Sequence, residues 1–198
     1  MLRKKQLPKK KIEKCGKICR VPIWDIKQAG MDQSIKWISY APNARFSVYD
    51  PLGNSSPGNP DTLTDDIVLD KETCLVWSRD ANISGLMNWL DANTVCREME
   101  LAGRMGWRLP TVEELSSLID PNQPNLALPV GHPFVKVQYG VGINAYWTST
   151  NSENPTAAAW LVNPWRGAGV HLVGLANKTS LGYVWPVRGG NGGNNWNW

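Results

Sequence analysis

The stretch GWRLPTVEELSSLID, residues 106–120, decides the fold around it because it holds the clearest start and stop signals for a helix. Thr111 follows Pro110 and precedes Glu114 by three residues. This is the spacing of a capping box, in which each side chain bonds the backbone N–H of the other residue. Asp120 followed by Pro121 ends the helix. The apolar residues between predict a buried stripe: Val112, Leu115, Leu118 and Ile119.

Upstream of this stretch, residues 84–101 predict a first helix because their apolar residues recur at spacings of three or four. These residues are Leu86, Trp89, Ala92, Cys96 and Met99. Earlier still, residues 67–70 and 74–77 are short apolar runs separated by Lys71-Glu72-Thr73, which predicts a hairpin. Residues 45–50 predict a strand, and 51–64 are a loop rich in Gly, Pro, Asn and Ser.

Downstream, a Pro-rich connection over 122–133 leads into four predicted strands at 145–150, 157–163, 170–174 and 183–188. Residues 164–169 between two of them predict a hairpin tip. The order is strands, two helices and then an antiparallel sheet, which is typical of the α+β class.

The distribution of charge divides the chain into a strongly basic N-terminal segment and a mildly acidic remainder. Residues 1–20 hold nine Lys or Arg against one acid, Glu13, which leaves 12 basic and 16 acidic residues from 21 to 198. The body therefore lacks the basic face of a specific nucleic-acid binder. We expect 1–20 to be a disordered tail, with weak polyanion binding as the alternative. The domain then spans 21–190, and 191–198 form a flexible Gly, Asn and Trp tail.

Membrane and export signals are missing from the sequence as it stands. No stretch reaches the ~18 apolar residues that span a bilayer. The first thirty residues also lack the apolar core of a signal peptide. Taken literally, the chain starts in the cytoplasm.

The four cysteines are an even number, compatible with disulfides in an oxidising compartment. Cys74 begins a predicted strand and Cys96 lies on the inward face of a predicted helix, so a bond between them would join sheet to helix. It would close a loop of about 22 residues and stabilise by about 3 kcal/mol. Two buried free thiols are the cytosolic alternative. Cys15 and Cys19 lack the further ligands that a metal site needs.

Residues that carry catalysis are scarce. His132 lies in a loop and His171 in a predicted strand, without the spacing of a zinc site. Glu113 and Glu114 are adjacent on a helix and diverge by about 100°. The chain contains no nucleophile elbow, phosphate loop or dinucleotide fingerprint. We expect no catalytic set, no metal and no cofactor.

Five segments resemble the Lcl C-terminal domain family, a bacterial family named for a collagen-like adhesin. They are 70–77 (DKETCLVW), 106–120 (GWRLPTVEELSSLID), 131–138 (GHPFVKVQ), 146–150 (YWTST) and 184–190 (VWPVRGG). They keep the family's order, and the resemblance covers 21–190. It implies a C-type-lectin-like fold, shared with formylglycine-generating enzymes and variable display proteins. In that fold the terminal strands pair, two helices pack on them, and the C-terminal sheet displays a ligand surface.

The resemblance also bears on single residues. It implies that Trp107 and Leu109 anchor a loop while Arg108 bonds backbone carbonyls. Family members usually have Gly where this chain has Cys74, and many have Cys where it has Pro186. These positions would be neighbours on paired strands, so the cysteine facing Cys96 would have moved from one strand to the other. Family members often carry a secretion signal, which implies an extracellular or cell-surface location; the cytoplasm is the alternative.

The function that follows is a non-catalytic module that binds a polysaccharide or a cell-surface protein. Its alternatives are a structural surface module without a saturable ligand and a formylglycine-generating type of oxidase. The oxidase would need a reactive cysteine pair in the C-terminal half, and no cysteine follows Cys96. The Glu-Pro-Asn motif of calcium-dependent lectins is also missing from the sequence.

The ligand surface is expected on the C-terminal sheet and its loops. Trp165 sits between Pro164 and Arg166 in a Gly-rich turn, and an exposed Trp beside an Arg is typical of interface hot spots. The alternative is that Trp165 folds back over the sheet edge. The full set of expected ligand-binding residues is Asn151, Ser152, Glu153, Asn154, Trp165, Arg166, His171, Asn177 and Lys178.

Overall fold

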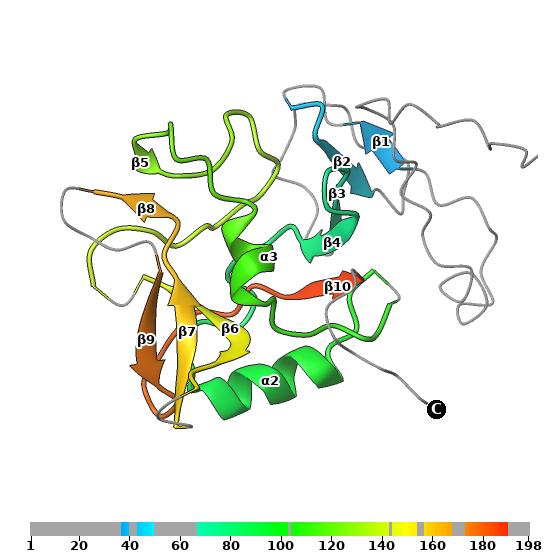
Figure 1. Ribbon diagram of the computed structural model, residues 1–198. Helices are drawn as coiled ribbons and strands as arrows, with labels where there is room; N and C mark the ends of the chain where they lie inside the picture. The colour runs from blue at the N-terminus through cyan, green and yellow to red at the C-terminus, as the bar shows by residue number, and fades with distance from the viewer. Residues whose placement is uncertain are drawn as a thin grey trace, which may run out of the picture.

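A computed structural model describes residues 37–39, 43–49, 67–102, 104–142, 144–153, 157–167 and 173–189. Figure 1 shows their arrangement. The two tails expected at 1–20 and 191–198 lie outside the described residues, as do Asn154 and His171.

The larger sheet has five strands in the order β1-β2-β3-β4-β10, all antiparallel. Their bounds are Trp37–Ser39, Phe46–Tyr49, Ile67–Asp70, Leu75–Ser78 and Val187–Gly189. Strands β3 and β4 form the predicted hairpin, and each is buried along its whole length. The last described strand, β10, pairs with β4, the fourth strand along the chain, rather than with the first. Residues near the end of the domain therefore complete a sheet that begins near its start.

A second sheet has three antiparallel strands in the order β6-β7-β9, with bounds Tyr146–Asn151, Ala158–Val162 and Val173–Asn177. Two predicted strands differ in extent: β9 runs on to Asn177, and β10 begins only at Val187. The expected hairpin tip is instead the short strand β8, Trp165–Arg166, which pairs with β5, Asn125–Leu126. The 122–133 connection returns to this edge and supplies the partner.

Helix α2, Trp89–Glu98, begins five residues later than the apolar pattern predicted. Asn88 caps it, since its side chain accepts a hydrogen bond from Asp91 N–H. Helix α3, Val112–Ser116, has the predicted capping box, with Thr111 and Glu114 each bonding the other's backbone. α3 lies between the two larger sheets in Figure 1.

Much of the tryptophan excess belongs to the core. Trp77, Trp107, Trp147 and Trp185 are almost fully buried, and Trp185 makes an edge contact with Phe134. Three of the four indole N–H groups donate to backbone carbonyls, those of Met87, Arg104 and Ser78. Such a bond offsets the cost of burying a polar group. The Trp77 N–H has no acceptor among the described residues.

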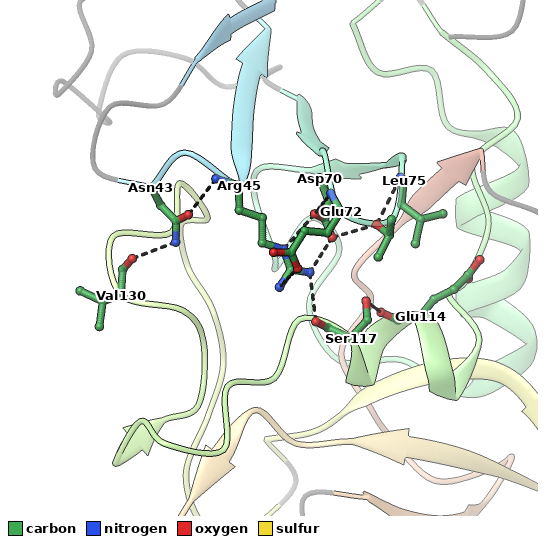
Figure 2. Close-up of polar contacts among 9 residues, drawn as sticks. Asn43, Arg45, Asp70, Glu72, Leu75, Glu114, Ser117 and Val130 are labelled. Carbon is green, nitrogen blue, oxygen red and sulfur yellow. Dashed lines mark hydrogen bonds and ion pairs between the residues drawn. The ribbon is translucent and has the colours of Figure 1, made fainter. Parts of the chain in front are cut away.

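A buried charge network joins the start of β2 to the hairpin (Figure 2). Arg45 donates two hydrogen bonds to the fully buried carboxylate of Asp70, at 2.8 and 2.6 Å. The same carboxylate accepts from Glu72 N–H and from the Thr73 hydroxyl. Burial disfavours the charged guanidinium, but the bond to Asp70 and the charges of Asp70 and Glu72 outweigh it and raise the pKa of Arg45. Arg45 also donates to Ser117 O, which ties the network to the end of α3.

Arg108 makes a second such junction. Its guanidinium forms a two-pronged pair with Glu114, with both N–O distances 2.7 Å. It also donates to the carbonyl oxygens of Leu109 and Gly189. The expected bonds from Arg108 to backbone carbonyls are therefore present. They connect the N-terminus of α3 to the end of β10, so this motif holds the fold together.

The predicted Cys74–Cys96 disulfide is wrong, because Cys96 is a free thiol. Cys96 is buried beside Leu109 and Trp147 against the three-stranded sheet. Cys74 lies in the turn between β3 and β4, with a φ of 59°, and its carbonyl lies near Gly189. The neighbourhood expected for Cys74 and Pro186 also fails, because Pro186 bonds to Ser78 at the other end of β4. Helix α2 directs Cys96 towards the three-stranded sheet, whereas Cys74 lies in a turn of the five-stranded sheet.

Candidate functional site

The three-stranded sheet distributes the expected ligand-binding residues over two opposite ends. β6 ends at Asn151 and β9 ends at Asn177, where the antiparallel β7 begins. Trp165 and Arg166 follow the other end of β7. Since a strand rises about 3.3 Å per residue, the two ends are roughly 13 Å apart along β7. The residues expected to form one surface are therefore divided between two.

We call the first group the Lys178 end; it consists of Trp89, Asn151, Glu153, Asn177 and Lys178. Its centre is a contact between helix and sheet. The Lys178 ammonium lies 4.1 Å from the centroid of the Trp89 ring, which is the geometry of a cation–π interaction. The backbone N–H of Trp89 donates to Lys178 O, and the backbone N–H of Lys178 donates to Ala157 O. These bonds fix the backbone from which the ammonium projects.

The Trp89 ring is held from its edge as well. Its indole N–H donates to Thr148 O at 2.8 Å, in the middle of β6. The ring is half-buried, with one contact to the sheet and one to Lys178. An aromatic plane fixed in this way loses little freedom when a ligand binds, which favours affinity.

Polar side chains lie at the same end of the sheet as this pair. Asn151, Glu153 and Asn177 are exposed, whereas Ser152 is buried with its backbone N–H bonded to Ala158 O. The amide oxygen of Asn177 accepts from the backbone N–H and the hydroxyl of Thr179. The Lys178 end therefore presents an ammonium, a carboxylate and amide groups close to an aromatic ring. Ser152 contributes to the turn rather than to this surface.

We call the second group the Trp165 end; it consists of Tyr139, Val141, Trp165 and Arg166. Trp165 is half-buried, and its ring lies against Gly167, where it leaves no room for a Cβ. Trp165 is thus not the fully exposed side chain that was expected, and its ring packs on the neighbouring backbone rather than projecting from a hairpin tip. Arg166 is exposed.

The loop that carries Tyr139 and Val141 is bonded to the end of β7. Asn163, which follows β7, donates its side-chain N–H to Gly140 O. Val141 and Tyr139 are 71% and 45% exposed, so the loop bonded to the end of β7 offers apolar surface. No local pattern in the sequence predicts this neighbourhood, because the two segments are brought together only by the fold. The same holds for Trp89, which its spacing assigned to the core.

Residues 66–188 match the Lcl C-terminal domain. The chain belongs to this family. The match contains both ends of the three-stranded sheet, while β1 and β2 of the larger sheet precede it. No curated protein matches the chain.

Two further observations describe the Lcl C-terminal domain of this chain. Across the residues that the structure describes, no helix is long and apolar enough to cross a membrane. The same residues contain no group of three or more His, Cys, Asp or Glu side chains placed to hold a metal ion.

Proposed function

We propose that this Lcl C-terminal domain is a non-catalytic, C-type-lectin-like binding module that acts outside the cell or at its surface. Its ligand is a polysaccharide or a cell-surface protein, and it contacts the Lys178 end. Membership of a family named for an adhesin supports a role at a surface. The pairing of β10 with β4 and the packing of two helices with two antiparallel sheets support the kind of fold.

The observation that carries the proposal is the Lys178–Trp89 pair, with exposed polar side chains from two strand ends beside it. Loops at the ends of a rigid sheet are common places for binding residues. A polysaccharide offers hydroxyl groups for hydrogen bonds and apolar ring faces for stacking. The exposed amide and carboxylate groups and the ammonium match the first requirement, and the half-buried indole beside Lys178 adds apolar surface.

A glycan array followed by affinity measurements on the full chain tests the proposal, together with binding to intact host or bacterial cells. We expect Lys178→Gln to weaken binding of the strongest ligand about tenfold, a loss of about 1.4 kcal/mol. Lys136→Gln is the matched control, because it removes an equal charge from a lysine that pairs with Asp80 and is not part of the Lys178 end. Circular dichroism checks that each variant is folded.

Arg166→Gln distinguishes the two ends of the sheet. If it weakens binding tenfold while Lys178→Gln does not, the site lies at the Trp165 end and the proposed location is wrong. Failure to find saturable binding to any glycan or cell surface would favour the structural surface module instead.

A further inference from the structure

Strand β9 forms an open edge of the three-stranded sheet. It pairs with β7 through five consecutive residue pairs without a bulge, and no described strand lies on its other side. Figure 1 shows it as the outermost strand of that sheet. Its sequence, VGLAN, contains no charge and no proline. Natural proteins commonly protect exposed edges with lysine, proline or a bulge, and β9 has none of these.

The hydrogen-bonding direction of β9 follows from its last bond to β7. Lys178 N–H donates to Ala157 O, directly after the opposed pair Asn177 and Ala158. In an antiparallel ladder every second residue bonds to the same neighbour. The residues of β9 that turn their N–H and C=O groups away from β7 are therefore Val173, Leu175 and Asn177. The carbonyl of Asn177 agrees, because it accepts from Ser180 N–H in the following turn rather than from β7.

Side chains on this edge form a short apolar row. Trp160 of β7 lies directly opposite Leu175 of β9, so both side chains are on the same face of the sheet. Trp160 is half-buried, and Leu175 is 49% exposed. Leu175, the central residue of β9, therefore belongs to the apolar row and also turns its backbone N–H and C=O groups away from β7.

We propose that two copies of this chain associate through β9, with the two β9 strands antiparallel about a two-fold axis at Leu175. Leu175 of one copy then exchanges both backbone hydrogen bonds with Leu175 of the second copy. Asn177 N–H of each copy donates to Val173 O of the other. The apolar row continues across the axis, from Trp160 and Leu175 of one copy to the same residues of the second. The two sheets become one.

A second copy fits this edge because the segment is complementary to itself. A two-fold interface brings the same patch of both subunits together, so each group must match its own symmetry mate. Leucine meets leucine at the axis, and an outward N–H meets an outward C=O on either side. The absence of charge from β9 means that no like charges face each other. The number of copies, which the sequence leaves open, is therefore two.

Sedimentation equilibrium of the full chain, with Leu175→Lys beside it, tests the inference. The wild type is expected to form a dimer, and Leu175→Lys to weaken dimerisation at least about tenfold, because it opposes two lysines at the axis. Leu181→Lys is the matched control: Leu181 is 50% exposed but lies outside β9, so this variant should dimerise like the wild type. Hydrogen exchange provides a second readout, in which the Leu175 and Asn177 amides exchange more slowly as the dimer forms.

A wild type that stays monomeric at its highest soluble concentration overturns the inference. So does a dimer that Leu175→Lys leaves intact, or one whose formation does not slow exchange at Leu175. Capture of an extended peptide at this edge by monomeric protein would identify a different occupant. These results are independent of ligand binding at the Lys178 end, which Lys178→Gln tests separately.

Discussion

Asp70 shows how this domain keeps a charge away from water. Its carboxylate accepts bonds from two guanidinium nitrogens, a backbone N–H and a hydroxyl, so its acceptor sites are occupied on all sides. A buried ion pair adds little net stability relative to apolar packing, but removing one partner leaves the other uncompensated. The pair therefore acts as a constraint on where β2, the hairpin and α3 meet.

Replacing Asp70 with Asn should lower the free energy of unfolding by about 3 kcal/mol, because Arg45 remains buried without a full counter-charge. Glu72→Gln is the control. Glu72 pairs with the same arginine, but its side chain is 65% exposed, and such pairs contribute less than about 1 kcal/mol. Urea unfolding of the two variants measures the difference. Equal losses would mean that burial of the carboxylate does not matter.

The buried Cys96 thiol makes the stability of the domain depend on pH in the alkaline range. Burial raises its pKa from 9.0 to about 12. Between these values the unfolded chain loses this proton and the native state keeps it, so native stability falls as the pH rises, by up to ~1.4 kcal/mol per pH unit. Wild type should be more stable than Cys96→Ala near pH 8, and this advantage should shrink towards pH 10. An advantage that is constant with pH, measured by urea unfolding, would contradict the raised pKa.

At the scale of single elements, local signals predicted well. The capping box at Thr111, the β3–β4 hairpin and the inward side of Cys96 all depend on neighbours within a few residues, and all are present. The start of α2 was misplaced because helical spacing continues through 84–88, where Gly85 has a φ of 72° and Asn88 supplies the cap.

Non-local pairing could not be predicted in the same way. β8 exists because β5 returns to its edge, and the Lys178–Trp89 contact joins residues 89 positions apart. The division of the ligand surface was within reach of the sequence, however. In three consecutive antiparallel strands, the loop after β6 and the end of β9 must lie at one end and the residues after β7 at the other. The prediction instead followed the local chemistry of Trp165 and Arg166, and therefore placed them on one surface with residues from the opposite end of the sheet.

The contribution of the capping box to stability can be measured by mutation. Thr111→Ala removes the hydroxyl that accepts from Glu114 N–H, and should destabilise the protein by about 1 kcal/mol. Ser116→Ala, at the last residue of the same helix, should change stability by less than about 0.5 kcal/mol. Thermal unfolding of both variants makes the comparison. Similar midpoints would show that α3 is positioned by packing and by Arg108 alone.

At the scale of the whole molecule, the last strand of the domain completes the sheet that the first strands begin. β10 supplies the second neighbour of β4, and Val187 in it is completely buried. Trp185 donates to Ser78 O across 107 residues of sequence. Arg108 then holds the end of β10 through Gly189 O.

A chain that ends after Trp185 should therefore fail to unfold cooperatively on heating, because β4 has lost its partner. A chain that ends after Gly190 keeps all of β10. We expect its melting temperature to stay within about 2 °C of the wild type, the shift that less than 1 kcal/mol produces in a domain of this size. Circular dichroism during heating records both. A cooperative transition in the shorter chain would show that β10 is dispensable.

The late arrival of β10 also has a consequence during synthesis. At ~5–20 residues per second, the ribosome needs on the order of ten seconds to travel from β4 to β10. Throughout that time β4 has an open edge, and the apolar side chains that β10 will cover remain available to chaperones. The larger sheet therefore stays incomplete until β10 has left the ribosome.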